Sequence, residues 1–204
     1  MTEKLVGYPK KSTLKNGKTI ELRPMVKDDE KPLFEFLKRL RPMEKLYLRH
    51  NVDDPNVVKN WAENIDYEKV IPILAFHEKR IIGNAALRRN FDVWSPHVAD
   101  IRLVTDIDYR KVGLGRILAQ EIFLLAIKLR IEKVTASIME DQDTAIAVFK
   151  SMGFEQEAFF KNHVVDWGGK KHNLVIMSHD ISDAWKKMED AYEADMPDKS
   201  GHWL

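Results

Sequence analysis

One glycine-bearing segment, Arg110-Lys111-Val112-Gly113-Leu114-Gly115, is the strongest candidate for chemistry in this sequence. It follows a strand-like run and leads directly into an apolar, helix-like run. The first N–H groups of a helix have no acceptor within the helix, and the helix dipole is positive there, so phosphate oxygens are favoured. Gly113 and Gly115 let a ligand approach the backbone closely. Nearby positive charge comes from Arg110, Lys111 and Arg116. The segment is therefore expected to bind an anion such as a pyrophosphate.

The spacing separates the ligand classes that use such a turn. A nucleoside-triphosphate loop needs Gly-Lys-Ser/Thr after its last glycine, whereas Arg116 and Ile117 follow Gly115. A dinucleotide-binding fold needs a further glycine three residues later, where Leu118 stands. Both classes are disfavoured, and a turn that binds nothing remains the alternative for this motif alone.

The elements on either side of the turn can be read from their periodicity. The helix is expected over residues 114–130, because its apolar residues recur at intervals of three, four and seven. The strand is expected over residues 98–105, with Ile101, Leu103 and Thr105 on one face. Asp100 and Arg102 fall on the other face.

The turn, between a strand and an apolar helix, resembles the Arg/Gln-x-x-Gly-x-Gly/Ala signature of the GNAT-type N-acetyltransferase superfamily. Residues 145–154, which end in Gly153-Phe154, are similar to that family's later helix-to-strand element. Residues 20–24, followed by Asp28-Asp29, are similar to its opening strand and first helix. The resemblance covers roughly residues 18–181.

The resemblance and the periodicities together predict a mixed α/β domain. We expect about six to seven mostly antiparallel strands in one sheet, with helices on both faces. The strands are predicted at 19–24, 70–77, 81–88, 98–105, 133–139, 159–165 and 174–178, and the earlier and later helices at 31–39, 55–66 and 143–152. A glycine-rich turn at 166–170 should join the last two strands. Residues 1–17 are predicted to be a loose lead-in, and residues 182–204 an amphipathic helix and tail.

The resemblance implies acetyl-CoA as the acyl donor. Its pyrophosphate would lie on the amides of the turn, and its pantetheine arm would bond to the last residues of the preceding strand. The implied cofactor-binding residues are Leu103, Val104, Thr105, Arg110, Lys111, Val112, Gly113, Leu114, Gly115 and Arg116. Arg110 would add charge near the phosphates or serve as a structural residue.

The acceptor in this family is usually an amine, which must lose a proton before it attacks the thioester. Asp100 matches the position of a carboxylate that often acts as general base, so we predict this catalytic role for it. The alternative is that Asp100 only pairs with Arg102 or Arg88. The family's tyrosine proton donor is replaced by Phe149, and an asparagine that often precedes it is replaced by Gln142. These two departures weaken the expectation of catalysis.

The acceptor pocket is expected between residues 39–61 and the final hairpin. Its candidate residues, chosen by type, are Tyr47, Arg49, His50, Trp61, His163 and Asp166. Aromatic residues at helical spacing more often belong to a core. Tyr109 is expected to pack rather than to act as an acid. The seven histidines show no metal-ligand spacing, so we expect no metal site.

Composition agrees with a single globular domain. The chain has 204 residues, of which 44% are hydrophobic and 32% charged. A formal charge of +1 makes direct nucleic-acid binding unexpected, and the longest apolar run is too short to cross a membrane. The absence of cysteine and the charged N-terminus favour a cytoplasmic protein. The predicted C-terminal helix would pack on this chain or form a homodimer contact.

Two functions follow from these observations. The first is an N-acetyltransferase that moves an acetyl group from acetyl-CoA to an amine on a small molecule or a protein. The alternative is a non-catalytic acyl-CoA-binding or sensing module that keeps the cofactor site.

Overall fold

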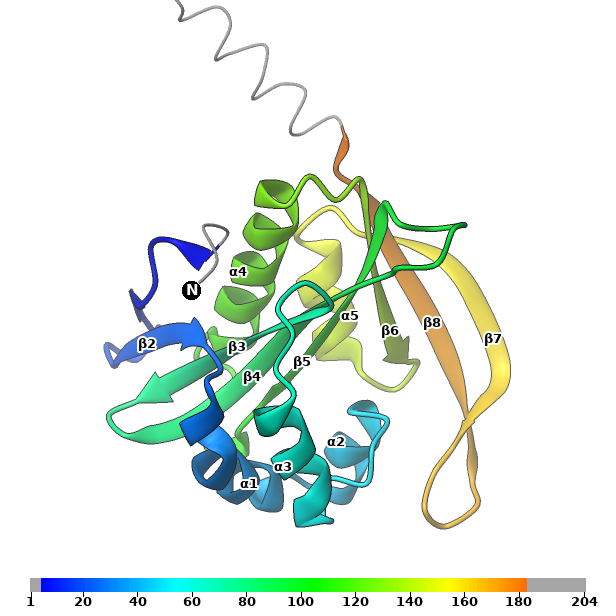
Figure 1. The fold of residues 1–204 in the computed structure, drawn as a ribbon. Helices are drawn as coiled ribbons and strands as arrows, with labels where there is room; N and C mark the ends of the chain where they lie inside the picture. The colour runs from blue at the N-terminus through cyan, green and yellow to red at the C-terminus, as the bar shows by residue number, and fades with distance from the viewer. Residues whose placement is uncertain (1–4, 183–204) are drawn as a thin grey trace, which may run out of the picture.

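The computed structural model describes residues 5–182, which form one sheet flanked by helices (Figure 1). The strands are β1 (Lys10–Thr13), β2 (Thr19–Pro24), β3 (Val70–His77), β4 (Arg80–Arg89), β5 (Val98–Thr105), β6 (Lys133–Met139), β7 (Glu155–Val165) and β8 (Lys171–Asp180). The α-helices are α1 (Glu30–Arg39), α2 (Pro42–Tyr47), α3 (Pro55–Glu63), α4 (Leu114–Lys128) and α5 (Asp143–Lys150). Short 3₁₀ turns, η2 (Lys27–Asp29) and η3 (Ile107–Tyr109), precede α1 and α4.

The strand order is β1-β2-β3-β4-β5-β6-β8-β7, and every neighbouring pair is antiparallel except β5 and β6. This confirms the predicted mixed, mostly antiparallel sheet. The described part of the chain holds eight strands, slightly more than the six to seven expected.

Helices cover both faces of the sheet, as predicted, and the alternation of side chains along β3 shows how. Ile71, Ile73 and Ala75 are buried in the cluster that contains α4 and Phe149 of α5. Leu74 and Phe76 are buried in a second cluster with α1 and α3. Because successive side chains of a strand point to opposite faces, one strand contributes to both cores.

The lead-in predicted for residues 1–17 is wrong where β1 forms. Residues 10–13 pair with β2, and both Leu5 and Leu14 are buried. Lys10 also reaches the carboxylate of Glu121 on α4, with an N–O distance of 2.6 Å. The sequence Lys-Lys-Ser-Thr has no apolar alternation, so it did not predict a strand. This edge strand is stabilised by its backbone pairing with β2 and by the buried leucines on either side.

The final hairpin and the helix before the acceptor region also differ from prediction. Strands β7 and β8 extend beyond the predicted 159–165 and 174–178. Helix α2 was not predicted, because it is only six residues long and follows α1 after a two-residue break. Its N-terminus is built by Pro42 in the first turn and by Glu44, whose carboxylate accepts from the Arg41 N–H at 2.9 Å.

The parallel pair β5 and β6 separates soon after it begins. Val98, Ala99 and Asp100 pair with Lys133, Val134 and Thr135, and no further pairing joins the two strands within residues 5–182. The later part of β5, including Leu103–Thr105, therefore has backbone groups that face no neighbouring strand on the β6 side. None of the described helices is long and apolar enough to cross a bilayer.

Candidate active site

A cleft of about 1070 Å³ lies where β5 and β6 diverge. Its walls come from the end of β5, the turn that leads into α4, the α2 segment, and α5 with the loop before it, together with Lys15. The β5 and turn residues that line it are Leu103, Val104, Thr105, Tyr109, Arg110, Lys111, Gly113, Gly115 and Arg116. The facing wall includes Tyr47, Asp141, Gln142, Thr144, Val148 and Phe149.

The turn at one end of this cleft has the geometry expected of an anion site. Gly113 is the N-cap of α4, with φ of 90°, and no side chain caps the helix. The first helical bond runs from the Ile117 N–H to the Gly113 carbonyl, at 3.0 Å. The N–H groups of the preceding three residues therefore have no acceptor within the helix and remain available to an anionic ligand.

Gly115 leaves space for a ligand at this turn. A Cβ at this position would meet no atom closer than Leu103 Cδ1, at 4.0 Å. Neither a close protein neighbour nor a positive φ requires a glycine there. The absent side chain instead opens the cleft next to the free N–H groups.

Cationic side chains surround the same end of the cleft. Lys15, Arg41, Arg110, Lys111 and Arg116 all line it. The guanidinium of Arg110 forms an ion pair with the buried carboxylate of Glu44 on α2. Burial lowers the pKa of Arg110, and Arg41 lowers it further. Arg110 thus links the turn to α2 and also contributes charge to the cleft.

Eight of the ten predicted cofactor-binding residues line the cleft, and Val112 and Leu114 do not. The side chain of Leu114 is buried in the core, and the Val112 carbonyl accepts a hydrogen bond from Lys15 N–H at 3.0 Å.

Asp100 lies apart from the cleft lining. Its carboxylate accepts a hydrogen bond from Arg102 Nε at 2.9 Å, and both side chains are less than one-fifth exposed. Arg88 lies directly opposite Asp100 on β4. This is the pairing that the sequence left open as the alternative, and the general-base role of Asp100 stays a prediction.

The position of the missing family tyrosine is occupied by a buried ring. Phe149 packs edge-on against Phe154, with ring centroids 4.9 Å apart, and still contacts the cleft. Gln142 accepts a hydrogen bond from Met139 N–H at 3.1 Å, so it stabilises the turn between β6 and α5. Neither residue supplies an acidic proton.

Tyr47 brings a phenol to the same cleft from α2. Burial raises the pKa of this phenol, and the nearby Asp141 carboxylate raises it further, whereas Arg41 lowers it. Tyr47 therefore keeps its proton at neutral pH. The sequence selected Tyr47 only as a residue of the acceptor pocket, because nothing in the spacing places α2 opposite α5.

The other acceptor candidates fall into two places. Arg49 and His50 lie near Arg102, which lowers the pKa of both. Burial is the larger cause for each of these two shifts. Trp61 packs edge-on against His50, with centroids 5.4 Å apart.

On the hairpin, Asp166 bonds to His172, a residue that the sequence did not select. His163 packs against Phe160 instead. The signal that could have found His172 is its position just after the predicted turn, across the hairpin from Asp166.

Tyr109 packs in the core, as expected, and its hydroxyl bonds to His77 Nδ1 at 2.8 Å. Within residues 5–182 no group of three or more metal-ligating side chains could hold a metal ion.

A family model described as the acetyltransferase (GNAT) family matches residues 32–154, more than half of the chain. This chain belongs to the GNAT acetyltransferase family. The matched range contains α2, the diverging strands, the glycine turn and α5, which line or flank the cleft. Comparison with curated protein sequences finds no match.

Solved structures share the fold at low sequence identity. The GNAT domain of S. lividans PAT superposes with a TM-score of 0.71 and 18% identity, covering 86% of this chain and 98% of that one. The ribosomal-protein-alanine N-acetyltransferase from Brucella melitensis superposes with a TM-score of 0.65 and 19% identity, covering 78% of this chain and 98% of that one. The yncA protein from Salmonella typhimurium, a putative acetyltransferase whose structure holds acetyl-CoA, superposes with a TM-score of 0.65 and 18% identity. The match covers 79% of this chain and 94% of that one. These similarities establish the fold of the GNAT family for this chain.

Proposed function

We propose that this chain is an N-acetyltransferase that transfers the acetyl group of acetyl-CoA to an amine by direct attack on the thioester. The observation that carries the proposal is the cleft between β5 and β6, which ends at the uncapped N-terminus of α4. A ligand with a diphosphate at one end and an extended amide-containing arm fits this combination of a helix start and an unpaired strand.

The residues present divide the binding of acetyl-CoA between backbone and side chains. The N–H groups around Gly113, Gly115 and Arg116 would hold the pyrophosphate, and Lys15 and Lys111 would add charge. The unpaired edge of residues 103–105 would bond to the pantetheine amides like an added strand. The thioester supplies an activated acetyl carbon, and the protein positions it.

Proton transfer is the remaining requirement. Tyr47 is the phenol in the cleft that can protonate the departing thiolate, in place of the tyrosine that Phe149 replaces. Its raised pKa keeps it in the protonated form that this role needs. Asp100 is the residue that the sequence predicts as the base for the amine. In the structure its carboxylate is paired with Arg102, which competes with the amine for the same oxygen atoms.

Two measurements test the proposed function. Isothermal titration calorimetry with CoA tests the cofactor site, and release of free thiol from acetyl-CoA with a panel of amines tests transfer. We expect CoA binding and amine-dependent thiol release. Binding without turnover on any amine would instead support a non-catalytic acyl-CoA-binding module, and absence of CoA binding would refute both.

The location and assembly of the protein remain predictions. Nothing in residues 5–182 tests the expected cytoplasmic location. The C-terminal helix predicted for residues 182–204, and its homodimer contact, lie outside the described residues except for Ser182.

A further inference from the structure

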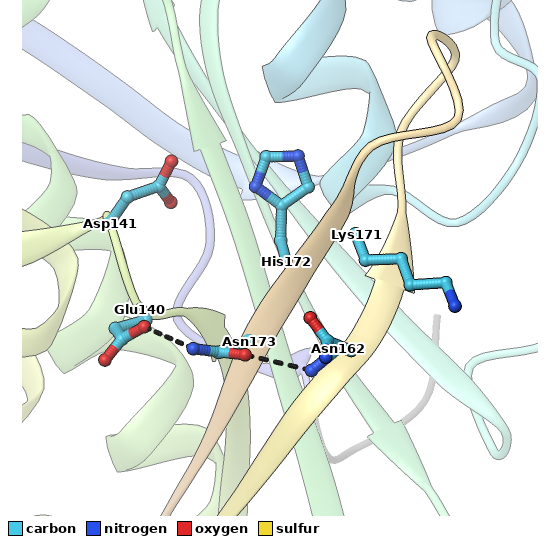
Figure 2. A pocket seen from close by; sticks show the side chains of 6 residues that line it. All are labelled: Glu140, Asp141, Asn162, Lys171, His172 and Asn173. Carbon is cyan, nitrogen blue, oxygen red and sulfur yellow. Dashed lines mark hydrogen bonds between the residues drawn. The ribbon is translucent and has the colours of Figure 1, made fainter.

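A second, smaller pocket lies beside the cleft, near the turn of the β7–β8 hairpin. Its volume is about 200 Å³, and Glu140, Asp141, Asn162, Lys171, His172 and Asn173 line it (Figure 2). Asp141 lines both this pocket and the larger cleft, so the two are neighbours on either side of this residue. Figure 2 shows the Asp141 carboxylate and the His172 ring on opposite sides of one hollow, while the Lys171 ammonium points away from it.

His172 is held in one orientation by a carboxylate behind it. Its Nε2 lies 2.8 Å from Asp166 Oδ2, and the imidazole side chain is only 13% exposed. Asp166 is itself fixed, because its Oδ1 accepts hydrogen bonds from Gly168 and Lys170 N–H at 2.9 and 3.0 Å. The hydrogen bond from His172 lowers the pKa of Asp166, as do these backbone N–H groups, so the carboxylate is ionised at neutral pH.

This arrangement determines which nitrogen of His172 faces the pocket with a lone pair. An ionised carboxylate can only accept, so the neutral imidazole donates Nε2–H to Asp166. Nδ1 is then unprotonated, and no hydrogen bond is made to it within residues 5–182. The dyad therefore presents a proton acceptor to the pocket, and the Asp166 carboxylate stabilises the imidazolium that forms.

The remaining polar groups of the pocket are mostly occupied by one another. Asn173 donates to Glu140 Oε2 at 2.7 Å and accepts the Asn162 N–H at 2.9 Å. Asn162 lies at a bulge of β7 with φ of 52°, which brings its N–H to Asn173. In contrast, Asp141 makes no hydrogen bond or ion pair within the described part of the chain. The Asp141 carboxylate and His172 Nδ1 are therefore both open to a ligand.

We propose that this pocket is the acceptor site, where Asp141 binds the substrate ammonium and His172 Nδ1 accepts its proton. The inference rests on the proposed acetyltransferase function, and it gives His172 the role that the sequence predicted for Asp100.

The reaction balances as follows. One N–H bond of the ammonium breaks and the proton moves to Nδ1. The neutral amine then forms a C–N bond with the acetyl carbon while the C–S bond breaks. The sulfur leaves with the electron pair and takes a proton from Tyr47, and Tyr47 regains a proton from the amide nitrogen. The imidazolium finally releases its proton to solvent.

The dyad also favours one class of amine. An α-amino group has a pKa of about 8, whereas a lysine-type amine has a pKa near ~10.4, so an α-amino proton passes to an imidazole far more readily. The proposed acceptor is therefore the α-amino group at the N-terminus of a peptide or protein. The charged or titratable groups around this site are Glu140 and Asp141 in the pocket wall, Asp166 behind His172, and Tyr47 from α2. Lys171 also lines the pocket, but its ammonium points away (Figure 2).

The test compares His172→Gln with His163→Gln, a control on the same hairpin that lies outside both pockets. The acceptors are the peptide Ala-Gly-Gly and, for a side-chain amine, Nα-acetyl-lysine amide. We expect His172→Gln to lower kcat/KM for Ala-Gly-Gly by about 10²-fold or more, to remove the acidic limb of its pH profile, and to leave KM for acetyl-CoA unchanged. The control should match the wild-type protein, and the lysine derivative should react more slowly.

A binding measurement keeps this test separate from that of the proposed function. The imidazole signals of His172 and His163 are followed by NMR as Ala-Gly-Gly is added to the CoA-bound wild-type protein. We expect the peptide to shift the His172 signal and not that of His163. An unperturbed His172, or a His172→Gln variant with wild-type kcat/KM and acidic limb, overturns the inference. Wild-type protein that shifts His172 but acetylates no amine refutes the acetyltransferase function while retaining the pocket.

Discussion

Gly115 offers the sharpest test of the cofactor site, because replacing it should change stability and binding in opposite directions. In the structure a Cβ at this position has its nearest neighbour at 4.0 Å and the residue does not have a positive φ. Gly115→Ala therefore introduces no clash or backbone strain. A glycine replaced by alanine in a compatible helical conformation stabilises a protein by about 0.4–1 kcal/mol. For a domain of this size that raises the Tm by about 1–4 °C.

The same methyl group would occupy the cleft beside the free N–H groups of α4. If the pyrophosphate lies there, it must withdraw and lose one charge-assisted hydrogen bond or more. Each such bond contributes about 1.5–3 kcal/mol, so the Kd for CoA should rise by roughly 10- to 150-fold. Calorimetric titration with CoA and thermal unfolding of the free protein measure the two effects separately.

Gly113→Ala is the matched control. Gly113 has φ of 90°, and a Cβ there would meet Lys15 Cγ at 3.6 Å, which is ordinary contact. Placing alanine at this positive φ introduces backbone strain of about 1–2 kcal/mol, which is expected to lower the Tm by about 2–8 °C. A Gly115→Ala protein that binds CoA as tightly as the wild type would refute the placement of the pyrophosphate at this turn. A lower Tm for that variant would show that the fold itself needs the glycine.

Three further predictions concern proton transfer and the support of the turn. Tyr47→Phe should lower kcat by about 10²-fold while leaving KM for acetyl-CoA unchanged, in a steady-state thiol-release assay, and an unaltered kcat would exclude Tyr47 as the proton donor. Asp100→Asn should keep the acidic limb of the kcat/KM profile, because the Asp100 carboxylate is bound to Arg102; loss of that limb would restore Asp100 as the base. Asp106 is buried, and although burial raises its pKa, the hydrogen bonds from Arg80, Asp108 N–H and Arg39 lower it more. The ionised Asp106 therefore stabilises the folded protein at pH values above the unfolded-state pKa of about 3.9. This stabilisation is lost as the pH falls through the lower pKa of the folded state. Asp106→Asn should therefore lower the free energy of unfolding at pH 7 by about 1–3 kcal/mol, and the difference from wild type should shrink in denaturation curves below about pH 4.

The strand, turn and helix that build the donor side were predicted from the sequence, for a local reason. A glycine turn between a strand and a helix requires no distant partner, so residues 110–116 specify their own geometry. The long apolar helix and the alternating strands on either side were predicted for the same reason. Eight of the ten predicted cofactor-binding residues line the cleft.

The acceptor side could not be predicted in this way, because its residues come from separate elements. Tyr47 is on a six-residue helix, Asp141 follows β6, and His172 is the second residue of the last strand. Their types were visible in the sequence, but no spacing relates them. Likewise, nothing local in the segment Lys10–Thr13 indicates that it pairs with β2.

By itself the sequence determined the family resemblance, the order of most elements and the helix start that would receive a phosphate, since each depends on periodicity or on turn chemistry within a short window. Only the tertiary structure decided that β5 and β6 part after three paired residues, that Asp100 is bound to Arg102, and that His172 and Asp141 face one pocket. Those facts depend on packing between residues far apart in the chain, where burial and hydrogen bonding select one arrangement among many that the local pattern allows.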